Sequence, residues 1–244
     1  MKSVLFLIII FLFNPSSKNI DELSSQYLMG KFEPSHDSRF VLISQEHLKR
    51  KMTIYMREEA YNAFIEMSNS AKKDGVDLKI LSATRTFHNQ KGIWEQKWNG
   101  ERAVDGKFLK NPKIPPPIER AKLIMQWSAM PGTSRHHWGT DIDLNELSNT
   151  YFETGEGKKV YNWLVNNAHH FEFCQVYTMK GEKRMYGYEE EKWHWSYKPL
   201  AQKFLTAYKT KITNKDIAGF SGAETADTLK ILQHYVLGVD STCF

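Results

Sequence analysis

The segment Ser134-Arg-His-His-Trp-Gly-Thr-Asp-Ile-Asp143 carries more information than any other in this chain of 244 residues. A second informative segment, Glu191-Lys-Trp-His-Trp195, follows after a long gap. Together they supply histidines, carboxylates and a glutamate three residues before the last histidine, which is the inventory of a catalytic zinc site. Such a site has three protein ligands, an open position for water and a carboxylate that moves the proton. We therefore expect one metal ion to join the two segments.

Spacing alone leaves the carboxylate ligand ambiguous. Residues two apart on a β-strand share a face, so Asp141 and Asp143 would both face the metal. Glu191 and His194 are three apart and cannot share a face of a regular strand, so a turn or bulge must separate them if both point at the zinc. The competing interpretation treats these histidines as packing residues beside tryptophans and the aspartates as turn residues.

The composition is that of an ordinary globular protein, with 41% hydrophobic and 25% charged residues. The length fits one elaborated domain or two small ones. A net charge of +5 is only mildly basic, and the cations are scattered apart from Lys49-Arg50-Lys51. We therefore expect no nucleic-acid partner, whereas an anionic cell envelope is compatible with this charge.

The N-terminus has the pattern of a secretory signal peptide. Met1-Lys2-Ser3 precedes an apolar run from Val4 to Phe13, and a polar segment with small residues follows. Spanning a bilayer needs roughly 20 apolar residues, so we expect no stable membrane span. We predict a signal peptide over residues 1–17 and an exported protein of the periplasm or cell envelope. A retained anchor and a buried N-terminal element are the alternatives.

The chain has two cysteines, Cys174 and Cys243. They are far apart and form no zinc-ribbon or CxxC pattern, so a zinc ion has to be held by histidine and carboxylate. In an oxidising compartment they could form one disulfide that ties the C-terminal tail to the body. Two unpaired thiols are the alternative.

Helices and short strands alternate along the chain. Apolar spacing and breaker residues predict helices at 57–74, 118–130, 160–168, 201–208 and 223–237, and a further helix that follows Gln90 and ends at Trp98. The same patterns predict strands at 76–81, 142–144, 171–178 and 184–188. Residues 99–118, with Pro115-Pro116-Pro117, are expected to form a loop. Because the strands cluster around the two motifs, we predict an α+β fold with a small, mostly antiparallel sheet flanked by helices.

These segments match the pattern Ser-x-His-x-x-Gly-x-x-x-Asp followed by Glu-x-Trp-His, which resembles the VanY-type zinc D-alanyl-D-alanine carboxypeptidases. The wider group includes the dipeptidase VanX and the fold of lysostaphin and hedgehog domains. A third segment, Ser82-Ala-Thr-Arg85-Thr-Phe-His-Asn-Gln90, is similar to the family's Ser-x-x-Arg-Ser-x-x-x-Gln, with Thr86 in place of the second serine. The three motifs stand in the family's order and cover about residues 55–197.

The resemblance implies a role for each matching residue. His136, Asp143 and His194 would bind Zn²⁺, which selects Asp143 over Asp141 as the carboxylate ligand. Glu191 resembles the general base that deprotonates the zinc-activated water and then protonates the leaving amine.

The remaining matches concern the substrate. Arg85 resembles the cation that stabilises the tetrahedral oxyanion, and Ser134 and Gln90 resemble residues that hold the terminal region of the substrate. Two positions depart from the common family pattern: Lys192 replaces a proline, and Asp141 replaces an alanine. A second carboxylate near the metal could raise the pKa of its partner or contact a ligand histidine.

The resemblance implies an exported zinc metallopeptidase that removes terminal D-Ala from peptidoglycan stem peptides. Endopeptidase action on cross-links and D-Ala-D-Ala dipeptidase action are the alternatives, and the 99–118 loop is expected to decide between carboxypeptidase and endopeptidase action. A non-catalytic, zinc-stabilised binding module is the alternative from another class. The implied organisation is a signal peptide (1–17), an N-terminal leader (18–54), a zinc peptidase domain (55–198) and a C-terminal helical extension (199–244).

Overall fold

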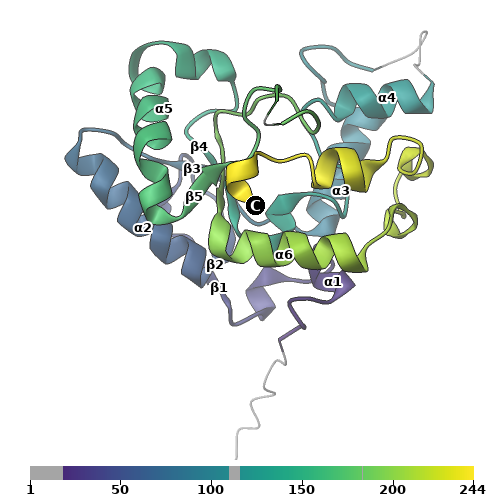
Figure 1. The fold of residues 1–244 in the computed structure, drawn as a ribbon, viewed down its shortest axis with the longest axis horizontal. Coiled ribbons are helices and arrows are strands. Elements are labelled where there is room, and N and C mark those ends of the chain that lie inside the picture. Colours follow the sequence, from purple (N-terminus) through teal and green to yellow (C-terminus); the bar gives the residue numbers. More distant parts are fainter. Residues whose placement is uncertain (1–18, 110–115, 183) are drawn as a thin grey trace, which may run out of the picture.

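A four-stranded antiparallel sheet lies at the centre of the computed structural model, which describes residues 19–109, 116–182 and 184–244. Its spatial order is β3 (Ile80–Ser82), β4 (Asp141–Leu144), β6 (His194–Tyr197) and β5 (Phe173–Gln175). Helices α2 and α5 lie on one side of it, and α3, α4 and α6 lie on the other (Figure 1). The predicted α+β fold with a small antiparallel sheet flanked by helices is confirmed.

Helices α2 (Glu58–Lys73) and α5 (Gly155–Asn167) pack against one face of the sheet. The buried residues of α2 recur at steps of three and four, which gives this helix one apolar face. Its first turn carries two glutamates and its last turn two lysines. Both pairs stabilise the helix, because their charges are opposite to those of the nearby ends of the helix dipole. Ile142, Leu144 and Trp195 of the sheet belong to the same apolar cluster.

The second apolar cluster is built by α1 (Ser25–Leu28), α3 (Phe87–Trp98), α4 (Pro117–Ile124), α6 (Lys198–Lys211) and the C-terminal segment. Helix α3 begins at a capping box in which Thr86 and Asn89 bond each other's backbone N–H groups. Its buried residues Gln90, Trp94 and Lys97 share one face. This face lies toward the segment that precedes the first motif, because Gln90 donates to the Ala129 carbonyl at 2.7 Å.

The pleat of β4 sorts its residues between the two sides of the sheet. Ile142 and Leu144 face the cluster of α2 and α5, so Asp141 and Asp143 face away from it. In the antiparallel pairing with β6, Asp143 lies opposite His194 and Asp141 lies opposite Ser196. The register therefore brings polar residues of both motifs onto one face.

Residues 19–57 pack against the motif-bearing body. They contain α1 and the antiparallel pair β1 (Phe40–Leu42) and β2 (Tyr55–Arg57). The Tyr27 hydroxyl donates to the Trp138 carbonyl at 2.9 Å, and the Trp138 indole donates to the Leu28 carbonyl at 3.0 Å. These bonds attach α1 directly to the middle of the first motif.

Both outer strands of the sheet are covered by other segments. The Lys49 amide donates to the carbonyl of Ile80 in β3 at 2.9 Å. Beside β5, the Asp240 amide donates to the Val176 carbonyl at 2.9 Å, and Cys243 forms a disulfide with Cys174. Figure 1 shows the C-terminal end of the chain next to β5.

Two predicted elements are wrong. The predicted helix at 223–237 is instead a 3₁₀ turn (Ala223–Thr225) and a short π-helical turn (Leu232–Val236), because Lys230 between them has a φ of 51° that a continuous helix does not allow. The predicted strand at 184–188 is a loop that closes on the Arg184 guanidinium, which donates to the carbonyls of Thr178, Tyr186 and Tyr188.

Other predictions fall partly or wholly outside the described residues. The expected signal peptide (1–17) and residues 110–115 of the expected loop at 99–118 lie outside the described residues. Within the described part of the chain, no helix has the length and apolar character needed to cross a bilayer.

Candidate metal centre and active site

His136, Asp143 and His194 form a buried cluster in which one ligand atom of each lies within 4.8 Å of the others. Asp143 and His194 meet because they are direct partners on β4 and β6. His136 comes from the 3₁₀ turn Arg135–Trp138 that leads into β4. Gly139 ends this turn with a φ of 76°, and a Cβ there would overlap the Phe40 ring, so the turn requires glycine.

The His136 ring presents one nitrogen without a partner to this cluster. Its Nδ1 lies 2.8 Å from the Ala83 carbonyl, which can only accept, so Nδ1 carries the proton. Among the described residues, its buried Nε2 has no hydrogen-bond partner, and it lies 3.4 Å from the Asp143 carboxylate. Burial and the Arg85 charge lower the pKa of His136, which keeps the ring neutral. An orphaned imidazole nitrogen beside a carboxylate fits a divalent cation.

The His194 ring lies close to three carboxylates. Its Nδ1 lies 2.9 Å from Glu191 and 3.8 Å from Asp143, and its Nε2 lies 2.9 Å from Asp141. Burial would lower the pKa of His194, but the hydrogen bonds to Asp141 and Glu191 raise it to about 9. The nitrogen that faces the cluster is therefore Nδ1, and a metal ion would have to replace its proton.

Asp141 lies on the far side of His194 from the cluster. This fully buried carboxylate accepts hydrogen bonds from Arg135 at 3.0 Å and from Thr140 and Ser196 at 2.7 Å each. Burial would raise the pKa of Asp141, but the Arg135 charge and the His194 bond hold it well below its usual value. Of the two aspartates left open by spacing, Asp143 belongs to the cluster and Asp141 holds the opposite nitrogen of His194.

Glu191 precedes β6 and reaches the cluster through a turn. The His194 amide donates to the Glu191 carbonyl at 3.2 Å, so the predicted turn between these two residues is present. The Glu191 side chain is buried, and this desolvation raises its pKa. A buried carboxylate with a raised pKa beside a candidate metal cluster has the properties of a general base.

The three other predicted site residues occupy different positions. Arg85 lies in the loop between β3 and α3, where its amide donates to the His136 carbonyl at 3.1 Å. Ser134 lines the same pocket as His136, Glu191 and His194. Gln90 is buried behind Ala129 and is not among the residues that line this pocket.

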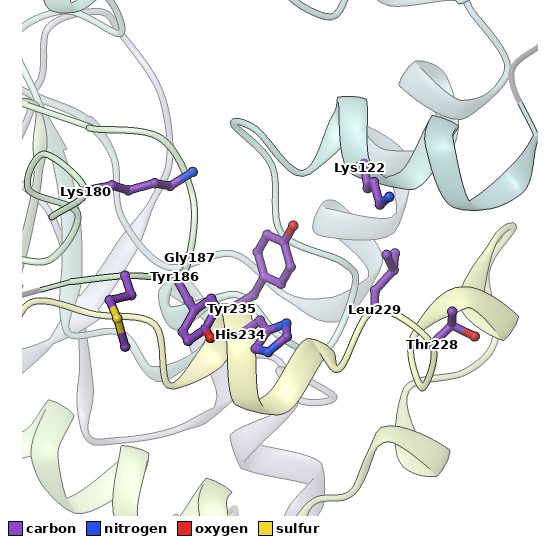
Figure 2. A pocket seen from close by; sticks show the side chains of 9 residues that line it. Lys122, Lys180, Tyr186, Gly187, Thr228, Leu229, His234 and Tyr235 are labelled. Carbon is purple, nitrogen blue, oxygen red and sulfur yellow. The ribbon is translucent and has the colours of Figure 1, made fainter. Parts of the chain in front are cut away.

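The cluster lies between two hollows that share Arg85. On one side is a groove of about 690 Å³ whose lining includes Asp143, Arg50 and Arg102. On the other is a narrow pocket of about 30 Å³ lined by the following residues: Arg85, Trp127, Ser128, Ala129, Ser134, Arg135, His136, Tyr177, Tyr188, Glu191 and His194. A further hollow, drawn in Figure 2, is lined by residues such as Lys122, Tyr186 and His234 and contains no member of the cluster.

His137 has a role that its position in the sequence left open. The structure buries it completely. Its Nδ1 donates to the Arg85 carbonyl at 2.6 Å, and its Nε2 accepts from the Gly132 amide at 3.1 Å. Burial lowers the pKa of His137 to about 3, so it is a neutral support for Arg85. The adjacent histidine pair was its only signal in the sequence.

The chain matches one family model and several known proteins. The model of the VanY family, D-alanyl-D-alanine carboxypeptidase, matches residues 53–200. The chain is 29% identical over 188 residues to "Putative carboxypeptidase YodJ" of Bacillus subtilis, covering 72% of this chain and 58% of that protein. It is 30% identical over 132 residues to a D-alanyl-D-alanine carboxypeptidase of Enterococcus faecalis, covering 54% of this chain and 44% of that protein.

The chain therefore spans about half the length of these curated relatives. Among solved structures, the LD-carboxypeptidase LdcB superposes with a TM-score of 0.51 at 22% identity, over 85% of this chain and 78% of that one. This likeness establishes a shared fold.

Proposed function

The chain belongs to the VanY family of D-alanyl-D-alanine carboxypeptidases, and from this premise we propose that it is a zinc-dependent enzyme that removes the terminal D-Ala of peptidoglycan stem peptides. The observation that carries the proposal is the position of the His136, Asp143 and His194 cluster between a groove of about 690 Å³ and a pocket of about 30 Å³. The groove has room for several residues of a peptide, whereas the pocket has room for little more than water.

The donor set suits zinc. Two imidazoles and one carboxylate match the ligands of catalytic zinc sites, which leave a fourth position open. Bound zinc lowers the pKa of water to about 7 and polarises a carbonyl group. In this chain, His136 Nε2, one Asp143 oxygen and His194 Nδ1 would hold the ion, while Ala83 and Asp141 fix the opposite nitrogens of the two rings.

Glu191 is the proposed general base. Its raised pKa brings it closer to neutral pH, which favours both accepting a proton from water and returning it to the leaving amine. Arg85 is the proposed partner of the developing oxyanion, because it lines both hollows and its backbone is held by His136 and His137. Ser134 and Gln90 are proposed to support the terminal part of the substrate.

The proposed location is the periplasm or cell envelope. Stem peptides lie outside the cytoplasmic membrane, and the N-terminal sequence has the signal-peptide pattern. The disulfide between Cys174 and Cys243 supports this location, because disulfides persist in oxidising compartments. The proposed catalytic unit is residues 55–198, with the segments before and after it as supports.

The test is hydrolysis of a stem pentapeptide ending in D-Ala-D-Ala by the zinc-loaded protein, with products identified by mass spectrometry. We expect loss of one D-Ala, and a fall in kcat of about 10²–10⁴-fold for Glu191→Gln. Glu190→Gln is the matched control, because its side chain is partly exposed beside the same motif.

Other outcomes select the alternatives. Release of the dipeptide D-Ala-D-Ala would assign a dipeptidase, and cleavage of cross-linked peptides alone would assign an endopeptidase. Binding of the pentapeptide without turnover, unchanged in Glu191→Gln, would assign a binding module. Any of these results would contradict the carboxypeptidase proposal.

A further inference from the structure

The large groove beside the metal cluster carries arginines that are not neutralised by ion pairs. Arg50, Arg85 and Arg102 all line this groove of about 690 Å³. Within residues 19–109, 116–182 and 184–244, none of their guanidinium groups forms an ion pair with a carboxylate. By contrast, Arg57 and Arg135 each pair with a carboxylate at 3.0 Å. The groove therefore offers cations that are free to bind an anion.

Two of these arginines come from segments outside the motifs. Arg50 follows Lys49, whose amide donates to the carbonyl of Ile80 in β3 at 2.9 Å. Arg102 follows α3, and its amide donates to the Gln96 carbonyl at 2.9 Å. Hydrogen bonds thus hold the backbone at or next to both arginines, while their side chains are exposed.

The acidic residues of the groove leave these two cations available. Glu33 and Glu146 also line the groove, and Asp143 belongs to the metal cluster. In the part of the chain that the structure describes, neither glutamate forms an ion pair with Arg50 or Arg102. A guanidinium group binds a carboxylate through two parallel hydrogen bonds, which makes a carboxylate the best-matched ligand for these arginines.

A stem peptide brings such a carboxylate into the groove. A carboxypeptidase removes one residue, so most of its substrate lies on the N-terminal side of the scissile bond. The groove has room for several residues and also contains Asp143 and Arg85, which places it at the site of reaction. The γ-linked D-glutamyl residue of a stem peptide leaves its α-carboxylate free, roughly 10 Å from the scissile bond in an extended chain.

We propose that Arg50 and Arg102 bind the α-carboxylate of this glutamyl residue, so that the enzyme prefers stem peptides in which the carboxylate is not amidated. This inference rests on the proposed function and adds a second point of substrate recognition. Arg85 remains available for the oxyanion. Arg50 precedes residues 53–200, which the family model matches, so this contact uses a segment outside that match.

The experiment compares two stem pentapeptides that end in D-Ala-D-Ala, one with the free α-carboxylate on the glutamyl residue and one with an α-amide. We expect the zinc-loaded wild type to prefer the free acid in kcat/KM by about 3- to 10-fold. Arg50→Met and Arg102→Met should each reduce this preference, and the double variant should abolish it. Lys51→Met and Lys107→Met are matched controls that should retain it, because both lysines are exposed and neither is among the residues that line the groove.

A second measurement needs no variant. Salt screens ion pairs between exposed groups, so raising NaCl from about 50 to about 500 mM should reduce the acid preference of the wild type. The loss should appear mainly in KM, because the contact is remote from the bond that breaks.

Four results would overturn the inference while leaving the proposed function intact. These are equal cleavage of acid and amide by the wild type, a preference that does not change with salt, a preference retained in the double variant, and an equal loss for both peptides in that variant. The last result would assign the arginines a structural role only. Cleavage of neither peptide by the zinc-loaded wild type would instead overturn the proposed function, and the inference with it.

Discussion

The centre of the molecule and its periphery are held by different interactions. The central network consists of Arg135, Asp141, His194 and Ser196, which are buried and bonded to one another at 2.7–3.0 Å. The outer segments, residues 19–57 and 212–244, are held by aromatic packing, a disulfide and partly exposed ion pairs. A buried charge that loses its partner is destabilising, whereas an exposed pair contributes little. Changes in the centre should therefore alter stability and chemistry together, and changes in the periphery should alter stability alone.

The sharpest test of this contrast is Asp141→Asn. The substitution leaves the Arg135 guanidinium buried without a compensating charge, so we expect the free energy of unfolding to fall by about 3–5 kcal/mol. It also weakens the hydrogen bond that orients His194, so we expect zinc affinity to fall about 10- to 100-fold. Urea unfolding and competition with a zinc chelator measure the two effects. Exposed Asp77→Asn is the control, and unchanged zinc affinity in Asp141→Asn would refute the support of His194.

The disulfide provides the opposite case in the periphery. Cys174 and Cys243 are 69 residues apart, so their bond constrains the unfolded chain, and Cys243→Ser should lower the free energy of unfolding by about 2–4 kcal/mol. We expect kcat of the folded variant to remain unchanged, because neither cysteine lines the narrow pocket. Parallel assays of thermal unfolding and peptide hydrolysis test both expectations. A large fall in kcat of the folded Cys243→Ser variant would contradict the expectation that changes in the periphery alter stability alone.

Zinc removal should affect the centre without unfolding the periphery. At free zinc of 100 times the dissociation constant, binding adds about 2.7 kcal/mol of stability, which a chelator should remove together with activity. The pKa of His194 is raised to about 9, so below that pH its proton competes with the metal and zinc affinity should rise as pH increases toward 9. Isothermal titration at several pH values measures this trend. Exposed His170→Ala should show the same trend, and a flat profile would contradict the role of His194.

The smallest effect is expected at Glu22, which anchors the N-terminal segment. Burial would raise its pKa, but hydrogen bonds from Lys203 and Arg57 lower it to about 2. Because the folded pKa lies below the usual value of 4.5, the stabilisation is fully present above that pH and is lost as pH falls through 2. Glu22→Gln should cost at most about 1 kcal/mol at pH 7, since the pair is partly exposed. A difference from wild type at pH 2 as large as the difference at pH 7 would contradict this assignment.

Short-range patterns predicted much of the fold and of the site. The periodicity of α2 indicated the helix, because it depends on neighbours in the sequence, whereas the resemblance to the VanY-type family indicated the three clustered residues. The turn between Glu191 and His194 also followed from strand geometry. The choice between Asp141 and Asp143 did not, because the pleat presents both on one face. Their different contacts, Asp143 in the cluster and Asp141 on Nε2 of His194, arise only from the packing of β4 against β6 and the preceding turn.

Long-range packing also explains the features that sequence patterns did not predict. Residues 223–237 have a helical pattern, yet the left-handed Lys230 interrupts them where they fold back on the body. Lys97 reads as a surface residue of a helix, and only the position of Ser128 across the fold makes it a buried cation. Such features depend on partners more than 30 residues away, as the separation of 31 between these two residues illustrates.

The covered sheet edges have a consequence for how the chain behaves in a crowded solution. An unpaired strand edge is a template onto which another molecule can add a strand, and this is a common start of aggregation. Here the residues next to β3 and β5, Lys49 and Asp240, occupy hydrogen-bonding positions at both edges of the four-stranded sheet. The disulfide at Cys243 keeps the C-terminal cover in place. The C-terminal segment therefore leaves less of this sheet edge open to pairing with a strand of another molecule.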